Sequence, residues 1–172
     1  MNQREATANL IRDLLEKAEG YILLEMYPEA LELVTKALTY DQNNSALYYY
    51  QGECLRGMQK FQDALTPFSK ALWLNPEDMG PYIGLGWCYK RLGKLDRAIE
   101  ILRDASKIQE DYPLVCYNLS CYYSIKNEKE EAIRWLKKAI EQDSRFSKLC
   151  REEEDFDNLR DMPEFSRLLE SK

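Results

Sequence analysis

Alanine recurs with a period of 34 residues along this chain of 172 residues. The members of the two series, which run in phase through four copies, are Ala30, Ala64, Ala98 and Ala132, then Ala37, Ala71, Ala105 and Ala139. A fixed period of about 20–50 residues indicates stacked copies of one supersecondary unit. Each copy in such a stack contacts only its neighbours, so the array presents a long surface. The period therefore constrains both the fold and the kind of function.

Each copy contains two segments with the apolar spacing of an amphipathic helix, as in PYIGLGWCYKRLG and DRAIEILRDASKI. Gly93 separates these two segments and predicts a helix C-terminus there. Small residues recur at one position of the first helix, which predicts that the paired helices approach closely. These residues are Ala18, Gly52, Gly86 and Ser120. The predicted copies are residues 11–44, 45–78, 79–112 and 113–146.

The two ends depart from the period, as the ends of an array must when they meet solvent. A helical extension occupies residues 1–10, and its helix is expected to begin at Gln3 or Arg4. Residues 147–172 are interpreted as capping helices that cover the fourth copy. In detail, the pattern predicts a helix near 145–153, a short turn around Phe156–Leu159 and a last helix from Met162 or Pro163.

Composition excludes several classes of function. The chain carries 30 acidic against 24 basic residues, a net charge of -6, and has no dense Lys/Arg cluster, so nucleic acid is not an expected partner. No segment reaches the run of about 18 apolar residues that a membrane helix needs, so membrane insertion is not expected. The N-terminus lacks the apolar core of a signal peptide. A cytoplasmic location is therefore predicted.

Catalysis and metal binding are also disfavoured. The chain has no histidine, which removes the commonest general base and metal ligand. Its five cysteines form no ligand spacing, and their odd number suits a reducing compartment. Cys54 and Cys88 occupy equivalent positions and are predicted to lie in the core. We therefore expect no enzyme activity, no metal and no cofactor.

The periodic residues follow a pattern of an aromatic residue, then Leu-Gly, then Tyr, then Ala, Phe, Ala and Pro. In the third copy they are Tyr82, Leu85, Gly86, Tyr89, Ala98, Leu102 and Ala105. This pattern resembles the tetratricopeptide repeat (TPR) family over about four-fifths of the chain. The resemblance implies an all-α, right-handed superhelix of antiparallel helix pairs, with the four copies as TPR 1 to TPR 4. The segment EDFDNLRDMPEF is similar to the end of many bacterial TPR arrays and suggests a bacterial-type protein.

In this family the first helices of successive repeats line a concave groove. The resemblance places eight residues in a partner-binding groove: Tyr49, Glu53, Arg56, Ile83, Trp87, Lys90, Tyr117 and Cys121. Tyr49, Trp87 and Tyr117 would form an aromatic row, flanked by Arg56, Lys90 and Arg91, a composition typical of interaction hot spots. The alternative is that Trp87 packs on its neighbours and is only partly exposed. Arg91 is expected to pair with an acidic neighbour.

The predicted function is a non-catalytic protein-interaction module (an adaptor, scaffold or assembly factor) that binds a peptide or helix of a partner in the groove. The alternative is a secretion chaperone of the type III class, which cradles a hydrophobic client segment. Repeats that clamp the C-terminus of heat-shock chaperones use Lys, Asn and Arg at positions that do not match here. A further alternative is an RNA reader of the related pentatricopeptide type, but those arrays are basic and this chain is acidic. Weak self-association by end-to-end stacking is left open.

Overall fold

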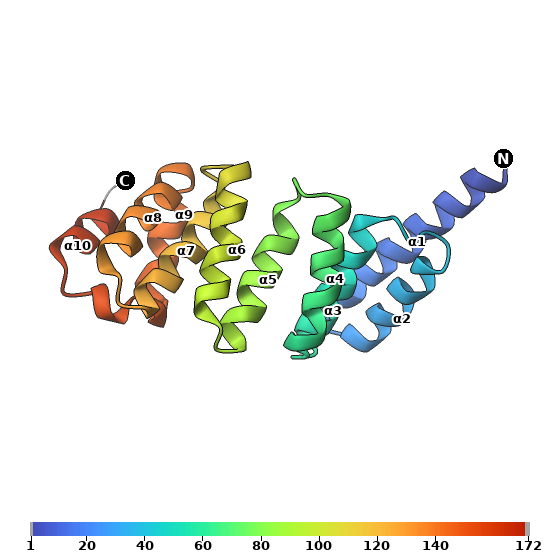
Figure 1. The fold of residues 1–172 in the computed structure, drawn as a ribbon, viewed down its shortest axis with the longest axis horizontal. Helices are drawn as coiled ribbons and strands as arrows, with labels where there is room; N and C mark the ends of the chain where they lie inside the picture. Colours follow the sequence, from blue (N-terminus) through green and yellow to red (C-terminus); the bar gives the residue numbers. More distant parts are fainter. Residues whose placement is uncertain (1, 171–172) are drawn as a thin grey trace. The chain divides into compact units, whose positions relative to one another are not determined.

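The computed structural model describes residues 2–170, which contain helices and turns and no strand. In chain order the elements are α1 (Gln3–Leu23), α2 (Tyr27–Leu38), α3 (Ser45–Gly57), α4 (Phe61–Leu74), α5 (Met79–Arg91), α6 (Leu95–Ile108), α7 (Pro113–Ile125), α8 (Lys129–Gln142), α9 (Arg145–Glu152), the 3-10 helix η1 (Glu154–Leu159) and α10 (Pro163–Glu170) (Figure 1). The all-α class of helix pairs is confirmed. None of the described helices is both long and apolar enough to cross a membrane.

The helices group into two compact units, one ending at Leu92 and the other beginning at Gly93. The first unit contains α1 to α5, and the second contains α6 to α10. Within the units, α1 packs on α2, α3 on α4 and α7 on α8, as the predicted helix pairs require. The boundaries of the four repeats stay a prediction.

Helix starts follow the local sequence. Asn2 and Glu5 form a capping box at the start of α1, because the Glu5 amide donates to Asn2 Oδ1 and the Asn2 amide donates to Glu5 Oε2, both at 2.8 Å. The predicted start at Gln3 is thereby confirmed. Asn44 and Asp78, which are 34 residues apart, accept from the amides of Ala46 and Gly80 at the starts of α3 and α5.

The turn inside each repeat contains one residue in the left-handed region, and these four residues are also 34 apart. They are Glu25 (φ 58°), Gln59 (φ 60°), Gly93 (φ 71°) and Asn127 (φ 61°). The prediction that Gly93 follows a helix C-terminus is confirmed, since α5 ends two residues before it. Only one of the four turns uses glycine, although a left-handed conformation costs other residues about 1–2 kcal/mol. The helix pairing that this turn closes must offset that cost at Glu25 and Gln59.

The core of the chain follows the alanine series. All eight alanines are at most 1% exposed, so the side chains that set the period lie between packed helices. In the first unit, the fully buried Phe68 of α4 lies against Gly52 of α3 and Gly84 of α5. A Cβ atom placed on Gly52 would be 2.6 Å from Phe68 Cδ1, which is closer than any real contact. These two glycines are therefore needed for the ring to fit between the helices.

The C-terminal segment of the second unit has the predicted order of a helix, a short turn and a last helix. Phe156 and Leu159 of η1 are fully buried, and Phe165 of α10 is 2% exposed, so the segment packs its apolar side chains inward. η1 packs on α7, where Asn158 both accepts from Ser124 Oγ at 2.6 Å and donates to the Ser124 carbonyl at 2.7 Å. η1 therefore packs on α7, and α9 and α10 pack on α8, while the bounds of the predicted capping segment stay a prediction.

Candidate functional site

Six of the eight predicted groove residues lie on α3 and α5 in the first unit, and these two helices are in contact. We call this set the α3–α5 face, and its members form three repeat-equivalent pairs: Tyr49 and Ile83, Glu53 and Trp87, Arg56 and Lys90. All six side chains are half-buried. They are therefore accessible in part, and their remaining surface is used for contacts within the unit.

Trp87 is at the centre of a group of rings and guanidinium ions. The Phe61 ring, at the start of α4, meets it edge-on with a centroid separation of 5.2 Å. The guanidinium carbons of Arg56 and Arg91 lie 5.1 Å and 5.5 Å from the indole ring centroid. We call these four residues the Trp87 cluster. Cation–π contacts of this kind contribute about 0.5–1 kcal/mol at exposed sites and hold the groups in fixed positions.

Arg56 binds the carboxylate of Glu53 on the same helix. Its Nε and Nη2 atoms donate to the two oxygens of Glu53 at 2.9 Å and 2.7 Å, which is a bidentate geometry. The hydrogen bond to Glu53 is the main reason that the pKa of Arg56 is raised, while burial acts in the opposite direction. Glu53 is therefore engaged by Arg56 rather than free for a partner.

Arg91 does not follow the sequence-based expectation of an ion pair with an acidic neighbour. Its guanidinium carbon lies 5.3 Å from the Phe61 ring centroid and 5.5 Å from that of Trp87. The residue is exposed, and no hydrogen bond or ion pair within residues 2–170 uses its N–H groups. The two aromatic rings attract this cation, and because the side chain is exposed its N–H groups can stay in water.

Sequence reasoning did not place Phe61 and Arg91 together, although the period contained the signal. Phe61 is the repeat equivalent of Tyr27, and Arg91 is the equivalent of Gly57. The Tyr27 ring packs directly against Gly57, so the same pair of positions is in contact in the preceding repeat. The contact is thus part of the repeat, and only its side-chain chemistry is particular to the Trp87 cluster.

Tyr49 is partly a packing residue. Its ring centroid lies 6.1 Å from that of Phe68 and 5.2 Å from that of Tyr50. The Tyr50 hydroxyl donates to a carboxylate oxygen of Glu19 on α1. Burial, and then this hydrogen bond, raise the pKa of Tyr50. Tyr49 therefore packs on Phe68 and Tyr50 within the unit, and the rest of its half-buried side chain is part of the α3–α5 face.

Tyr117 and Cys121 do not line an open groove, and for them the expectation is wrong. They are 8% and 3% exposed, because α9 and η1 cover this part of α7. The Tyr117 ring stacks on Phe146 with a centroid separation of 4.6 Å and meets the Phe156 ring edge-on at 5.8 Å. This burial raises the pKa of the Tyr117 hydroxyl. The α3–α5 face is the part of the predicted site that stays accessible.

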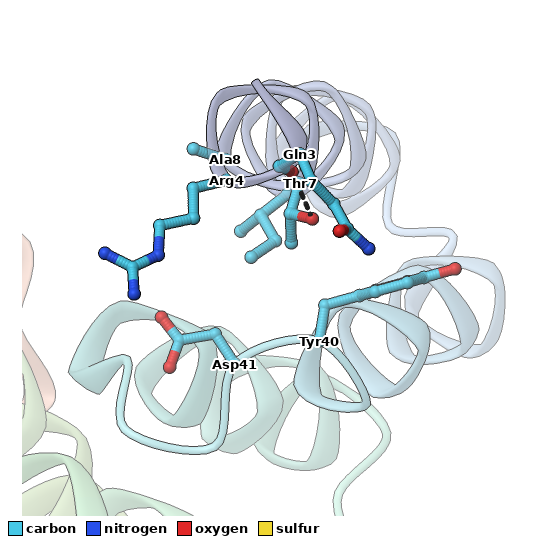
Figure 2. A pocket seen from close by; sticks show the side chains of 7 residues that line it. Gln3, Arg4, Thr7, Ala8, Tyr40 and Asp41 are labelled. Carbon is cyan, nitrogen blue, oxygen red and sulfur yellow. Dashed lines mark hydrogen bonds between the residues drawn. The ribbon is translucent and has the colours of Figure 1, made fainter.

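Other concavities lie elsewhere. Hollows of about 580 Å³ beside α2 and about 320 Å³ beside α6 are lined by repeat-equivalent residues, so they arise from helix packing itself. A third hollow, of about 440 Å³, lies between the first turns of α1 and the end of α2. Figure 2 shows Arg4 and Asp41 directed toward each other across it. None of the three contains a predicted site residue.

The buried thiols of the first unit are not activated. Burial raises the pKa of the Cys54 thiol to about 12 and that of Cys88 to about 11, so both are protonated at neutral pH. Their predicted position in the core is confirmed. Within residues 2–170 no group of His, Cys, Asp and Glu side chains is arranged to hold a metal ion. What the α3–α5 face can supply is contact surface.

Comparison with known proteins identifies the family. A model described as anaphase-promoting complex, cyclosome, subunit 3 matches residues 24–105, and a tetratricopeptide repeat model matches residues 114–146. The TPR-containing protein trd-1 of Caenorhabditis elegans is 26% identical over 81% of this chain and 19% of its own length. The TPR repeat-containing protein MJ1428 of Methanocaldococcus jannaschii is 26% identical over 67% of this chain and 20% of its own. The chain belongs to the tetratricopeptide repeat family. It spans about a fifth of the length of these two relatives.

Solved structures agree with this assignment. MamA is 25% identical, with a TM-score of 0.71 over 84% of each chain. YrrB, described as a TPR protein with an unusual peptide-binding site, is 27% identical, with a TM-score of 0.66 over 79% of this TPR chain and 71% of its own. TTC0263 of Thermus thermophilus is 19% identical with a TM-score of 0.78 over 92% of this chain and 87% of its own, a likeness of fold. The TPR family and fold are generally those of non-catalytic interaction modules.

Proposed function

We propose that this TPR chain binds an extended peptide or a helix of a protein partner on its α3–α5 face, as an adaptor, scaffold or assembly factor. The observation that carries the proposal is the Trp87 cluster, a half-buried indole fixed between an aromatic ring and two guanidinium ions. Tryptophan and arginine dominate the binding energy of protein interfaces when they occupy such positions. YrrB, a relative with the same fold, is itself described as peptide-binding, which supports the proposal.

Preorganisation gives the Trp87 cluster an energetic advantage. A side chain that becomes ordered on binding costs about 0.5–1.5 kcal/mol. Trp87 contacts Phe61, Arg56 and Arg91 in the free chain, so much of that cost is already met by folding. The half-buried Ile83, one turn earlier on α5, extends the surface with an aliphatic contact. A partner segment with an apolar side chain would find a rigid surface to pack on.

The test is peptide selection followed by affinity measurement. Peptides selected from a random displayed library on the wild-type chain are labelled, and their binding is measured by fluorescence anisotropy. Trp87→Ala is expected to weaken binding by about tenfold or more, since interface hot spots contribute about 2 kcal/mol or more. Circular dichroism spectra and melting curves establish that the variant is folded.

The matched control is Trp73→Ala. Trp73 lies on α4, is 73% exposed and contacts Lys70, so it is a more exposed tryptophan outside the α3–α5 face. Its replacement should leave peptide binding within about twofold of wild type. Peptides that bind Trp87→Ala normally and lose affinity for Trp73→Ala would refute the assignment. The cytoplasmic location, the bacterial-type origin and weak self-association stay predictions.

A further inference from the structure

The guanidinium of Arg91, at the end of α5, forms no hydrogen bond or ion pair with the described residues. The residue is exposed, and its guanidinium is positioned by two aromatic rings rather than by an anion. A guanidinium presents N–H groups in a planar fork that matches a carboxylate. Because the rings fix its position, Arg91 can receive a carboxylate with little loss of side-chain freedom.

The neighbouring arginine shows the chemistry that this environment favours. Arg56, whose guanidinium carbon also lies near the Trp87 ring, already binds the Glu53 carboxylate through two hydrogen bonds of 2.9 Å and 2.7 Å. An intramolecular carboxylate thus satisfies one of the two guanidinium ions of the Trp87 cluster. The other one faces solvent.

The second unit provides an example of what lies on the equivalent helix face. Tyr117 of α7 is the repeat equivalent of Ile83, and two rings cover it: Phe146 stacks on it, and Phe156 meets it edge-on. Phe156 belongs to the run EEEDFDNL at 152–159, which combines one aromatic residue with five acidic ones. In the second unit an aromatic side chain thus covers the position equivalent to Ile83, which is half-buried on the α3–α5 face.

We propose that the Trp87 cluster recognises an acidic peptide, with an Asp or Glu carboxylate bound to the Arg91 guanidinium and an adjacent aromatic side chain packed on Trp87. This inference rests on the proposed function and specifies the chemistry of its partner. The net charge of -6 means that the chain as a whole repels such a peptide. Any attraction of the acidic peptide must therefore come from the Trp87 cluster. The loss of one arginine from this cluster should then change the affinity measurably.

The experiment uses three labelled peptides with blocked ends: EEEDFDNL, its amide analogue QQQNFNNL and EEEDADNL. Their affinities are measured on the full chain by fluorescence anisotropy at about 0.15 M ionic strength. EEEDFDNL is expected to bind about tenfold more tightly than either of the other two, because each analogue lacks one of the two contacts. Arg91→Ala should remove the difference between the acidic peptide and its amide analogue. Arg91→Lys should keep only part of it, since lysine lacks the fork.

The control is Arg97→Ala, which removes an exposed arginine of α6 that pairs with Glu100 at 2.5 Å. It should change no affinity by more than about twofold. A loss equal to that of Arg91→Ala would overturn the inference, because it would indicate attraction by charge alone. Failure of EEEDFDNL to bind would overturn it as well, and so would tighter binding of a uridine octanucleotide. Peptides that bind through Trp87 regardless of charge would overturn this inference and leave the proposed function standing.

Discussion

Replacing Gly93 with alanine is expected to lower the free energy of unfolding by about 1 kcal/mol, although the new methyl group would meet no other atom. The structure separates two effects that usually coincide at a glycine. A Cβ atom on Gly93 has nothing within 4 Å, so no steric clash with a neighbour arises. The backbone φ of 71°, however, lies in the left-handed region, which a residue with a Cβ atom disfavours.

The expected magnitude is a difference of two terms. The left-handed conformation costs a residue with a Cβ atom about 1–2 kcal/mol. Alanine also lowers the conformational entropy of the unfolded chain, and this stabilises the folded state by about 0.4–1 kcal/mol. The net destabilisation is therefore about 1 kcal/mol, and for a chain of this size it corresponds to a fall in melting temperature of about 2–4 °C.

Gly20→Ala is the matched control. Gly20 lies in α1, is exposed and also has nothing within 4 Å of an added Cβ atom, but its conformation is helical. There alanine should stabilise the chain by about 1 kcal/mol, because it is the better helix former. Urea and thermal unfolding, followed by far-ultraviolet circular dichroism, should thus move the two variants in opposite directions. If Gly93→Ala were as stable as wild type or more stable, the argument from backbone conformation would be refuted.

Three further predictions concern packing, polar satisfaction and thiol chemistry. Gly52→Ala should destabilise the first unit by about 1–3 kcal/mol in urea unfolding, because its methyl group collides with the buried Phe68 ring, and adding Phe68→Leu should recover part of the loss. Asn158→Ala should cost about 1–3 kcal/mol in the same assay, because the buried Ser124 hydroxyl loses its acceptor; equal stability would show that water replaces the amide. All five cysteines are buried, and a thiol of pKa about 11, such as Cys88, is ionised in about one molecule per thousand at pH 8. A thiol-specific disulfide reagent should therefore label the native chain only slowly and the urea-unfolded chain at once, and rapid labelling of the native chain would contradict the burial.

Much of the α3–α5 face could be predicted from the sequence, because helical period and repeat register together specify which positions face outward. Trp87 is the clearest case: it packs on its neighbours and is only partly exposed, as one of its two expectations has it, while its contact with a partner stays a prediction. At Arg91 the sequence leaves two kinds of contact open. An ion pair and an aromatic contact both suit an arginine at that position, and only the spatial arrangement of Phe61 and Trp87 decides between them.

The sequence alone determined the repeat, the alanine core and the order of the C-terminal elements, because these depend on spacing within a helix and on contacts between adjacent repeats. Only the tertiary structure decided that Tyr117 and Cys121 are buried. Their own helix has the same register as α3 and α5, yet both are buried, and Tyr117 is covered by Phe146 and Phe156, which lie well beyond α7 in the chain. Exposure depends on everything that packs against a residue, and a local pattern contains no information about a segment that returns from the end of the chain.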